Sequence, residues 1–267
     1  MYEKTRLLDS FCYFCESLHG IMDERRKIEE PVSAEFERFN KDFEASLRSE
    51  TTRLQSAIDV ILNSTGKHVR PLLVLLTAKV CGQVTDNTIN SAVLLELLHT
   101  ATLIHDDVID ETKQRRGVPS LNAIFDNRIS VLVGDYVLST ALLHIAYSGR
   151  ERIVTNLAKL GQTLSNGEIL QLSNIQNREV SEDVYYEIIK NKTAALFSAC
   201  AGIGALSVGA TEDEVTAAEE FGHNLGVIFQ IRDDIFDYYD DANIGKPTGN
   251  DMAEGKLTLP VIYALSL

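Results

Sequence analysis

The sequence contains the acidic pattern Asp-Asp-x-x-Asp twice, at residues 106–110 and 233–237. Each copy ends a long apolar stretch with helical spacing, so its first and last carboxylates share one face of a helix. Six carboxylates that faced each other would repel strongly unless a positive charge lay between them. Because no cluster of His or Cys accompanies these hard oxygen ligands, the pattern favours Mg²⁺, which binds protein carboxylates and substrate phosphates together.

Apolar residues recur with helical spacing along the whole chain, and the alternating β-branched runs that a sheet needs are missing. The chain of 267 residues, 45% of them hydrophobic, is long enough to bury one large core. We predict a single all-α domain of about ten helices, with the apolar residues 89–104 and 196–208 at its centre. The expected helices cover residues 32–62, 72–81, 86–110 with Asp86 as its cap, 129–147, 151–173, 182–207, 212–239 and a last segment from Leu259.

The two ends of the chain differ from the rest. We expect residues 1–31 to form an N-terminal extension and residues 32–267 the main domain. Cys12 and Cys15 form a CxxC pair, which is either a metal or redox pair or, more simply, two small apolar residues on one helix face. Because the chain stops at Leu267 within an apolar helical pattern, we expect the C-terminus to be incomplete.

The net charge of −14 argues against nucleic-acid binding, which needs a basic surface. Neither a signal peptide nor an apolar run long enough to span a membrane is visible, and four scattered cysteines fit a reducing cytoplasm. In so acidic a chain, any local cluster of Lys and Arg points to an anionic ligand.

Such basic clusters follow both acidic motifs. Arg115 and Arg116 follow the first motif within one loop, and a glycine-containing loop with Lys246 and Lys256 follows the second. Carboxylate-bound Mg²⁺ on one side and guanidinium or ammonium groups on the other suit a diphosphate group. The order of acidic motif and basic loop occurs twice, and this is hard to explain as surface decoration.

A third basic cluster runs from Lys67 to Arg70, immediately before a predicted helix, where anions are favoured. His99 lies two helical turns before Asp106 on nearly the same face. A lone His on an apolar helix is often a satisfied core residue, so His99 is either that or part of the acidic site.

Together with Lys192-Thr193, these motifs resemble the trans-prenyltransferase (polyprenyl diphosphate synthase) family over residues 32–265. The resemblance implies an all-α, isoprenoid-synthase-type bundle around a central cavity and a homodimer. It implies an enzyme that condenses isopentenyl diphosphate with an allylic diphosphate, such as farnesyl or geranylgeranyl diphosphate, and releases pyrophosphate. Mg²⁺ and fixed cations are suited to the negative charge that develops on the leaving diphosphate.

The resemblance also implies roles for individual residues. Three Mg²⁺ ions would be held by the six aspartates Asp106, Asp107, Asp110, Asp233, Asp234 and Asp237. The allylic diphosphate would be bound by Arg115, Lys192, Thr193, Gln230, Lys246 and Lys256. Isopentenyl diphosphate would be bound by Lys67, Arg70, His99 and Arg116.

Product length can be argued from helix geometry. Ala101 and Thr102 lie just over one turn before Asp106, and Leu98 lies one turn deeper. Large aromatic residues at these positions would plug a cavity that runs along this helix, whereas these side chains leave it open. We therefore expect a long-chain product of C30 or above, of the kind that octaprenyl-type synthases make.

Several alternatives stay open at this point. The chain could be a C15–C20 synthase of the same family, or a terpene cyclase or squalene-synthase-like enzyme, although the Lys67–Arg70 cluster argues for a second diphosphate site. It could be a non-catalytic subunit of a heteromeric synthase, although both aspartate triads are intact. An acidic helical interaction module leaves the apolar helices that end in carboxylates unexplained.

Overall fold

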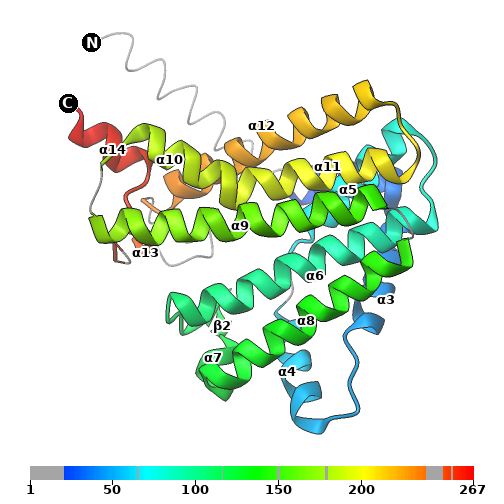
Figure 1. Ribbon diagram of the computed structural model, residues 1–267, viewed down its shortest axis with the longest axis horizontal. Helices are drawn as coiled ribbons and strands as arrows, with labels where there is room; N and C mark the ends of the chain where they lie inside the picture. Colours follow the sequence, from blue (N-terminus) through cyan, green and yellow to red (C-terminus); the bar gives the residue numbers. More distant parts are fainter. Residues whose placement is uncertain are drawn as a thin grey trace.

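The computed structural model describes residues 21–64, 66–115, 117–148, 151–177, 180–238, 249–253 and 255–267. Helices make up almost all of this part of the chain, and its one sheet is a hairpin of two short strands (Figure 1). The predicted all-α fold is therefore confirmed. Val32 is fully buried in the core, whereas the predicted domain boundary at residue 31 stays a prediction.

The elements follow one another along the chain from α2 to α14. They are α2 (Ile21–Glu29), a 3-10 turn (Glu30–Val32), α3 (Ser33–Ser46), α4 (Thr52–Asn63), α5 (Val69–Cys81), α6 (Asp86–Ile109), β1 (Gln114–Arg115), β2 (Val118–Pro119), α7 (Leu121–Phe125), α8 (Asn127–Ser148), α9 (Glu151–Asn177), α10 (Glu182–Ile189), a π-helical turn (Lys190–Ala194), α11 (Ala195–Ser207), α12 (Glu212–Phe236), α13 (Asn250–Ala253) and α14 (Leu259–Leu265).

Helices α6 and α11 form the centre of the bundle, as their apolar sequences predicted. α6 packs against α8, α5, α11 and α3, and α11 packs against α12, α5 and α9. Leu94, Leu95 and Leu97 of α6 are at most 1% exposed, as are Phe197 and Ile203 of α11. Since burial of one such side chain stabilises a fold by about 1.5–3 kcal/mol, these two helices are the most constrained elements of the domain.

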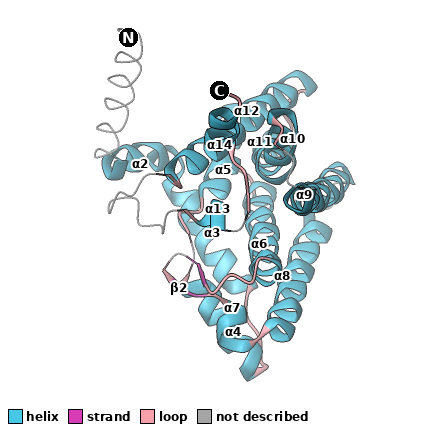
Figure 2. Cartoon of the chain, turned by 90° about the vertical axis from the view of Figure 1, so that its left-hand side faces the viewer, coloured by secondary structure: helices cyan, strands magenta, loops and turns pink. Residues whose placement is uncertain are grey.

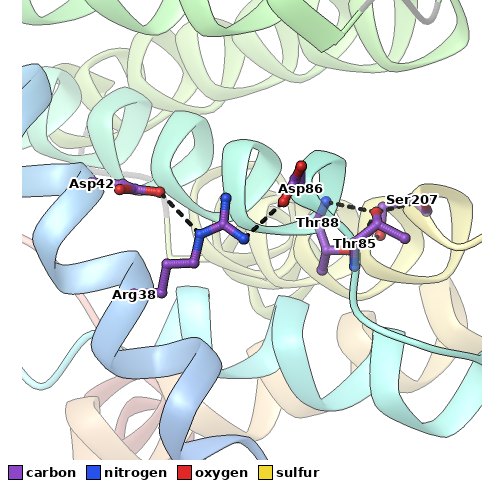
Figure 3. Close-up of polar contacts among 6 residues, drawn as sticks. All are labelled: Arg38, Asp42, Thr85, Asp86, Thr88 and Ser207. Carbon is purple, nitrogen blue, oxygen red and sulfur yellow. Dashed lines mark hydrogen bonds and ion pairs between the residues drawn. The ribbon is translucent and has the colours of Figure 1, made fainter.

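The N-terminal end of α6 is fixed from two sides (Figure 3). Its cap is Thr85 and not the predicted Asp86: Thr85 Oγ1 accepts the Thr88 N–H at 3.3 Å, and Thr88 Oγ1 accepts the Thr85 N–H at 3.1 Å. The Thr88 hydroxyl also bonds to Ser207 Oγ at the end of α11, at 2.7 Å. Asp86, one residue into the helix, pairs instead with Arg38 of α3 at 2.7 Å.

The prediction of one helix over residues 32–62 is wrong, because the chain breaks between α3 and α4. In the break, the Ser49 N–H donates to Gln55 Oε1 at 2.8 Å, and the Thr51 N–H donates to Ser49 Oγ at 3.2 Å. Polar side chains that bond to nearby backbone in this way compete with helical hydrogen bonds. The apolar spacing continues across the break and therefore conceals it.

Two glycines set how closely α12 lies against α11. A Cβ at Gly222 would come within 2.5 Å of the Phe197 carbonyl oxygen, and one at Gly226 within 2.6 Å of the Ala194 Cα. Only glycine permits this approach, because both neighbours are backbone atoms that cannot rotate away. The contact therefore determines where the second acidic motif lies, about two to four helical turns further along α12.

The C-terminal ends of α6 and α12, which carry the two acidic motifs, lie on the same side of the domain. This is the left side in Figure 1, and it faces the viewer in Figure 2. Helices α10, α13 and α14 gather at this side as well. Among the described residues, no helix is both long and apolar enough to cross a membrane.

We predict that Gly222→Ala lowers the free energy of unfolding by about 1–3 kcal/mol, because the new methyl group overpacks the contact between α11 and α12. Gly161→Ala is the matched control, since a Cβ there meets nothing within 4 Å on α9, and it should stabilise by about 0.5–1 kcal/mol. Urea unfolding monitored by circular dichroism measures both. Equal effects of the two substitutions would contradict the packing argument.

Candidate active site

The first acidic motif ends α6 and meets the strand hairpin. Asp107 is 5% exposed, and its Oδ1 accepts from Arg115 Nε at 2.8 Å and lies 2.6 Å from the second guanidinium nitrogen. The Asp107 carbonyl accepts the side-chain amide of Asn122 in α7 at 2.9 Å. Glu111, with φ of 51°, turns the chain sharply out of the helix. The helix end, the hairpin and α7 are thereby joined at one residue.

Asp106 lies one residue earlier, about 100° round the helix, and faces α9. Burial raises the pKa of Asp106 to about 6, and the neighbouring charge of Glu168 contributes to the rise, whereas Lys192 opposes the shift. The carboxylate of Asp110 adds to the same excess of negative charge. A cation close to Asp106 would relieve this repulsion.

The second acidic motif is held by a chain of hydrogen bonds. Asp234, 3% exposed, accepts the Tyr185 hydroxyl at 2.6 Å and the Gln230 side-chain amide at 2.7 Å. The Gln230 oxygen accepts the Thr193 hydroxyl at 2.7 Å. Burial raises the pKa of Asp234 and these two hydrogen bonds lower it, while Asp233 and Asp237 raise it. One carboxylate is thus oriented by a connected set of three side chains.

Lys192 and Thr193 lie in the π-helical turn between α10 and α11. Sequence spacing predicted one α-helix over residues 182–207, and the structure keeps the helix but widens it for this turn. A π turn inserts an extra residue, and such turns are frequent at functional sites. Lys192 Nζ bonds to Gln171 Oε1 at 2.9 Å and forms an ion pair with Glu168, both on α9. The turn therefore directs both side chains towards the acidic ends.

Lys256 joins the two acidic motifs across the site. Its Nζ lies 3.1 Å from Asp110 Oδ2 of the first motif, and both side chains are 18% exposed. Its backbone N–H donates to the Asp251 carbonyl at 2.7 Å, while the Asp251 N–H donates to Asp237 Oδ2 of the second motif at 3.2 Å. The segment that contains α13 is thus tied to both motifs.

A pocket lies beside Asp107 on the side of the hairpin. Its lining includes Gly66, Glu96, His99, Asp107, Arg115 and Ser120. His99 is 9% exposed, and its Nε2 lies 2.9 Å from a guanidinium nitrogen of Arg70. Lys67 is exposed on the loop next to the pocket. The structure therefore brings Lys67, Arg70 and His99 together beside the pocket that Arg115 lines, and their shared role stays a prediction.

A second pocket lies on the side of α9 and α10, lined among others by Gln171, Lys192, Thr193, Gln230, Asp234 and Lys256. Of the residues predicted for the allylic diphosphate, it gathers four. Arg116 and Lys246 lie outside the described residues, as do Cys12 and Cys15. Among the described residues, Leu98, Ala101 and Thr102 line neither of these two pockets.

Three residues of the site were not found from the sequence. Tyr185 precedes Lys192 by two helical turns, and Glu168 and Gln171 share one face of α9. These spacings could have indicated them, but amphipathic surface helices show the same spacings. Glu168 and Gln171 belong to the site because α9 approaches the π turn, where both side chains contact Lys192.

Within the described part of the chain, no three His, Cys, Asp or Glu side chains converge as closely as a bound metal ion requires. Asp107 is instead paired with Arg115 and Asp110 with Lys256, while the charge of Lys192 lowers the pKa of Asp106. The donor set nevertheless fits a hard divalent cation, because it consists of carboxylate oxygens and includes Asp106, whose pKa is raised by burial first and by the charges of Glu168 and Asp110 second. These groups are therefore able to hold such a cation.

Comparison with known proteins agrees with this arrangement. The polyprenyl synthetase family model matches residues 51–267. The octaprenyl diphosphate synthase of Haemophilus influenzae is 37% identical over 245 residues, which cover 91% of this chain and 74% of that relative. Component 2 of the heptaprenyl diphosphate synthase of Geobacillus stearothermophilus is 39% identical over 227 residues, which cover 85% of this chain and 71% of that relative.

Solved structures show the same fold. A polyprenyl synthase from Caulobacter crescentus, in complex with calcium and isoprenyl diphosphate, has a TM-score of 0.85 at 33% identity, covering 90% of this chain and 73% of that one. A geranylgeranyl pyrophosphate synthase from Bacteroides thetaiotaomicron has a TM-score of 0.78 at 46% identity, covering 91% and 74%. The fold and the relatives define an all-α trans-prenyltransferase. The chain belongs to the polyprenyl synthetase family, which confirms the resemblance of its motifs.

We predict that Asp106→Asn stabilises the protein when divalent cations are removed. The pKa of Asp106 is raised to about 6, whereas an unfolded Asp titrates near 3.9, so the folded state binds this proton more tightly. Ionised Asp106 therefore opposes folding above pH 6, and this cost fades as the pH falls towards 4. At pH 7.5 the substitution should add on the order of 1–3 kcal/mol to the free energy of unfolding, and about half of that at pH 5.

Urea unfolding in the presence of a chelator measures this effect at both pH values. Exposed Asp59→Asn is the control, and it should change stability by less than about 0.5 kcal/mol at either pH. An Asp106→Asn protein that is less stable than wild type at pH 7.5 would contradict the account of a repulsive acidic site.

We predict that Tyr185→Phe increases the Mg²⁺ concentration needed for half-maximal prenyl transfer by about tenfold, because partners that orient a ligating carboxylate typically have effects of this size. The substitution removes only the hydroxyl that bonds to Asp234. Tyr186→Phe is the control, since its ring packs edge-on against Tyr185 and tests the aromatic layer alone. An unchanged Mg²⁺ requirement in a folded Tyr185→Phe protein would remove Tyr185 from this role.

Proposed function

We propose that this chain condenses isopentenyl diphosphate with an allylic diphosphate, farnesyl or geranylgeranyl diphosphate, to form a long-chain all-trans polyprenyl diphosphate. Pyrophosphate is released, and the reaction depends on Mg²⁺. The observation that carries the proposal is the presence of two pockets lined in part by charged side chains, one at the acidic end of α6 and one at the acidic end of α12. One diphosphate substrate on each side of the aspartates brings the two reacting carbons to the same place.

The pocket beside α9 and α10 is the site proposed for the allylic diphosphate. Lys192 and Lys256 supply positive charge there, while Thr193 and Gln230 are hydrogen-bonded to each other and face the same space. When the allylic C–O bond breaks, its electron pair leaves with the diphosphate. Fixed cations stabilise that developing charge without having to reorganise. Arg115, which pairs with Asp107 and lines the hairpin pocket, is proposed to reach this diphosphate from that side, and Lys246 is proposed to complete the set.

The pocket beside the hairpin is the site proposed for isopentenyl diphosphate. Its polar wall includes His99, which is bonded to Arg70, and the loop that carries Lys67 borders it. Arg116 is proposed to join them. No side-chain nucleophile is required, because the double bond of isopentenyl diphosphate attacks the allylic cation. The departing diphosphate is the proposed acceptor of the proton that is then lost from the CH2 carbon between the tertiary cationic carbon and the diphosphate-bearing carbon of the former isopentenyl unit.

The six aspartates of the two motifs are the proposed ligands of Mg²⁺, with three ions per site. When bound, the metal neutralises the diphosphate oxygens and the aspartates together. The pairing of Asp107 with Arg115 and of Asp110 with Lys256 supports this, because each carboxylate is already balanced by a cation of the chain. These cations can then turn to the substrate diphosphate.

The growing chain is proposed to follow the Asp106 face of α6, past Thr102 and Leu98, with Ala101 beside them. The helical rotation of 100° per residue separates this face from the one that lines the hairpin pocket at Asp107 and Glu96. The small side chains of Ala101 and Thr102 support a long product. The 46% identity to a geranylgeranyl pyrophosphate synthase keeps a C15–C20 product as the second candidate.

A homodimer is the proposed assembly, and the exposed apolar face of α8 supports it. Leu132, Leu142 and Leu143 are each more than half exposed there. The likeness to a protein called component 2 keeps a heteromeric partner as the alternative occupant of this face. The cytoplasm is the proposed location, since Cys81 and Cys200 are unoxidised thiols in the described part of the chain.

The experiment that tests the function is incubation of the purified chain alone with Mg²⁺, farnesyl diphosphate and labelled isopentenyl diphosphate, followed by sizing of the products. We expect products of C30 or longer. Products that end at C15 or C20 would refute the long-chain assignment and favour the short-chain alternative. No incorporation by the chain alone, with activity restored by a partner chain, would favour the heteromeric alternative.

We predict that Ala101→Phe shortens the product, because a ring would fill the proposed chain path within two turns of the metal ligands. Since Ala101 is only 2% exposed, the melting temperature is measured alongside, and Thr102→Phe, at a half-buried position on the Asp106 face, is the second variant. Unchanged product length in both folded variants would show that the chain grows along another path.

A further inference from the structure

The loop that carries Lys67 leads into α5, whose second residue is Arg70, and its backbone is unusual at His68, the residue after Lys67. His68 adopts a left-handed conformation, with φ of 47° and ψ of 43°, and it is the N-cap of α5. A residue with a Cβ occupies this region only at a cost, so such a conformation persists only when surrounding contacts hold it. The contacts that hold His68 therefore decide where its neighbours point.

Both nitrogens of the His68 ring face polar side chains, and Nδ1 is within hydrogen-bonding distance of its neighbour. Nδ1 lies 3.1 Å from Asn40 Oδ1 of α3, and Nε2 lies 3.8 Å from Glu96 Oε1 of α6. The ring also packs edge-on against Phe39 and Phe43, with centroid distances of 5.3 Å and 5.5 Å. With a side chain only 12% exposed, His68 is buried between α3 and α6.

The neighbours of His68 lie on the pocket side of this anchor. Lys67 is exposed, and its carbonyl accepts a guanidinium N–H of Arg25 in α2 at 2.8 Å. Arg70 reaches His99 at the wall of the pocket, and its guanidinium lies over the Phe197 ring at 5.1 Å. The loop is thus held by α2, α3 and α6 together.

We propose that His68, together with Asn40, is a positioning residue of the isopentenyl diphosphate pocket. Its side chain fixes the left-handed turn that directs Lys67 and Arg70 towards the donor diphosphate. Asn40 lies in α3, before residues 51–267 that the family model matches. The hydrogen bond that holds His68 therefore comes from a residue outside the matched region. The inference rests on the proposed function for the identity of the ligand, and it adds residues that bind no substrate atom.

If His68 only stabilised the fold, its substitution would give a different result from the one expected for a residue that positions the donor pocket. Loss of the anchor should weaken only the donor pocket, because the residues of the allylic pocket lie on α9, the π turn, α12 and the segment around Lys256. General loosening of the fold would weaken both substrates. Binding of each substrate by itself, measured by titration calorimetry in Mg²⁺, separates the two cases without depending on turnover.

The test compares His68→Gly, which retains the left-handed backbone but loses the ring, with Asn40→Ala and with the double variant. The probes are isopentenyl diphosphate and the unreactive farnesyl thiolodiphosphate. We expect His68→Gly to raise the Kd for isopentenyl diphosphate about tenfold and Asn40→Ala to raise it about threefold. The double variant should raise it no more than His68→Gly does, because both substitutions remove the same anchor. The Kd for farnesyl thiolodiphosphate should stay within about twofold of the wild-type value in all three variants. In His68→Asn, which tolerates the left-handed backbone and keeps an amide, the increase should be smaller.

Arg38→Ala is the matched control, because it removes a contact between α3 and α6 away from the loop, and it should change neither Kd. Wild-type affinity for isopentenyl diphosphate in a folded His68→Gly protein would overturn the proposal. So would an equal loss for both probes, or a wild-type protein that does not bind isopentenyl diphosphate. A wild-type protein that binds both probes as expected but forms no longer product would contradict the proposed function and leave the anchoring role supported.

Discussion

The accumulation of like charge at the ends of α6 and α12 is the constraint on which the rest of the domain depends. Two helices bring acidic C-terminal ends to one side, where the helix dipoles are also unfavourable for carboxylates. The chain offsets this with Arg115, Lys192 and Lys256, each from a different segment. The hairpin, the π turn and the segment after α13 are all positioned so that a cation lies near an aspartate.

The geometry of helix α6 directs its two adjacent aspartates towards different parts of the site. Asp106 and Asp107 are adjacent in sequence, yet they point about 100° apart. Asp107 faces the hairpin pocket, and Asp106 faces α9 and its Glu168. One buried helix, fixed at its start by Thr85 and Thr88, can therefore serve both the proposed donor pocket and the proposed chain path. Rigidity of this kind suits a reaction in which two carbons must be held together so that they react before water attacks the cation.

Much of this could be predicted from the sequence, because helices, acidic motifs and basic loops are local patterns. Apolar spacing predicted α6, α11 and α12, and the aspartates needed only their position at helix ends. The break between α3 and α4 could not be seen, since Ser49 and Gln55 form side-chain bonds there while the apolar spacing runs on. Thr85 displaced Asp86 as the cap because Thr88 bonds back to it. Tyr185 and Glu168 could not be recognised as site residues from the sequence, because their contacts join different helices, and the spacing within one helix does not indicate such contacts.

The central claim is that both aspartate motifs hold the same set of divalent cations around one diphosphate. The most direct measurement is a crystal structure of the protein with Mg²⁺ and the unreactive farnesyl thiolodiphosphate. The account predicts Mg²⁺ ions bound by aspartates of both motifs, with Lys256 moved from Asp110 to the diphosphate. A diphosphate bound away from both motifs, or an Asp110–Lys256 pair that stays intact with no metal beside it, would contradict the account.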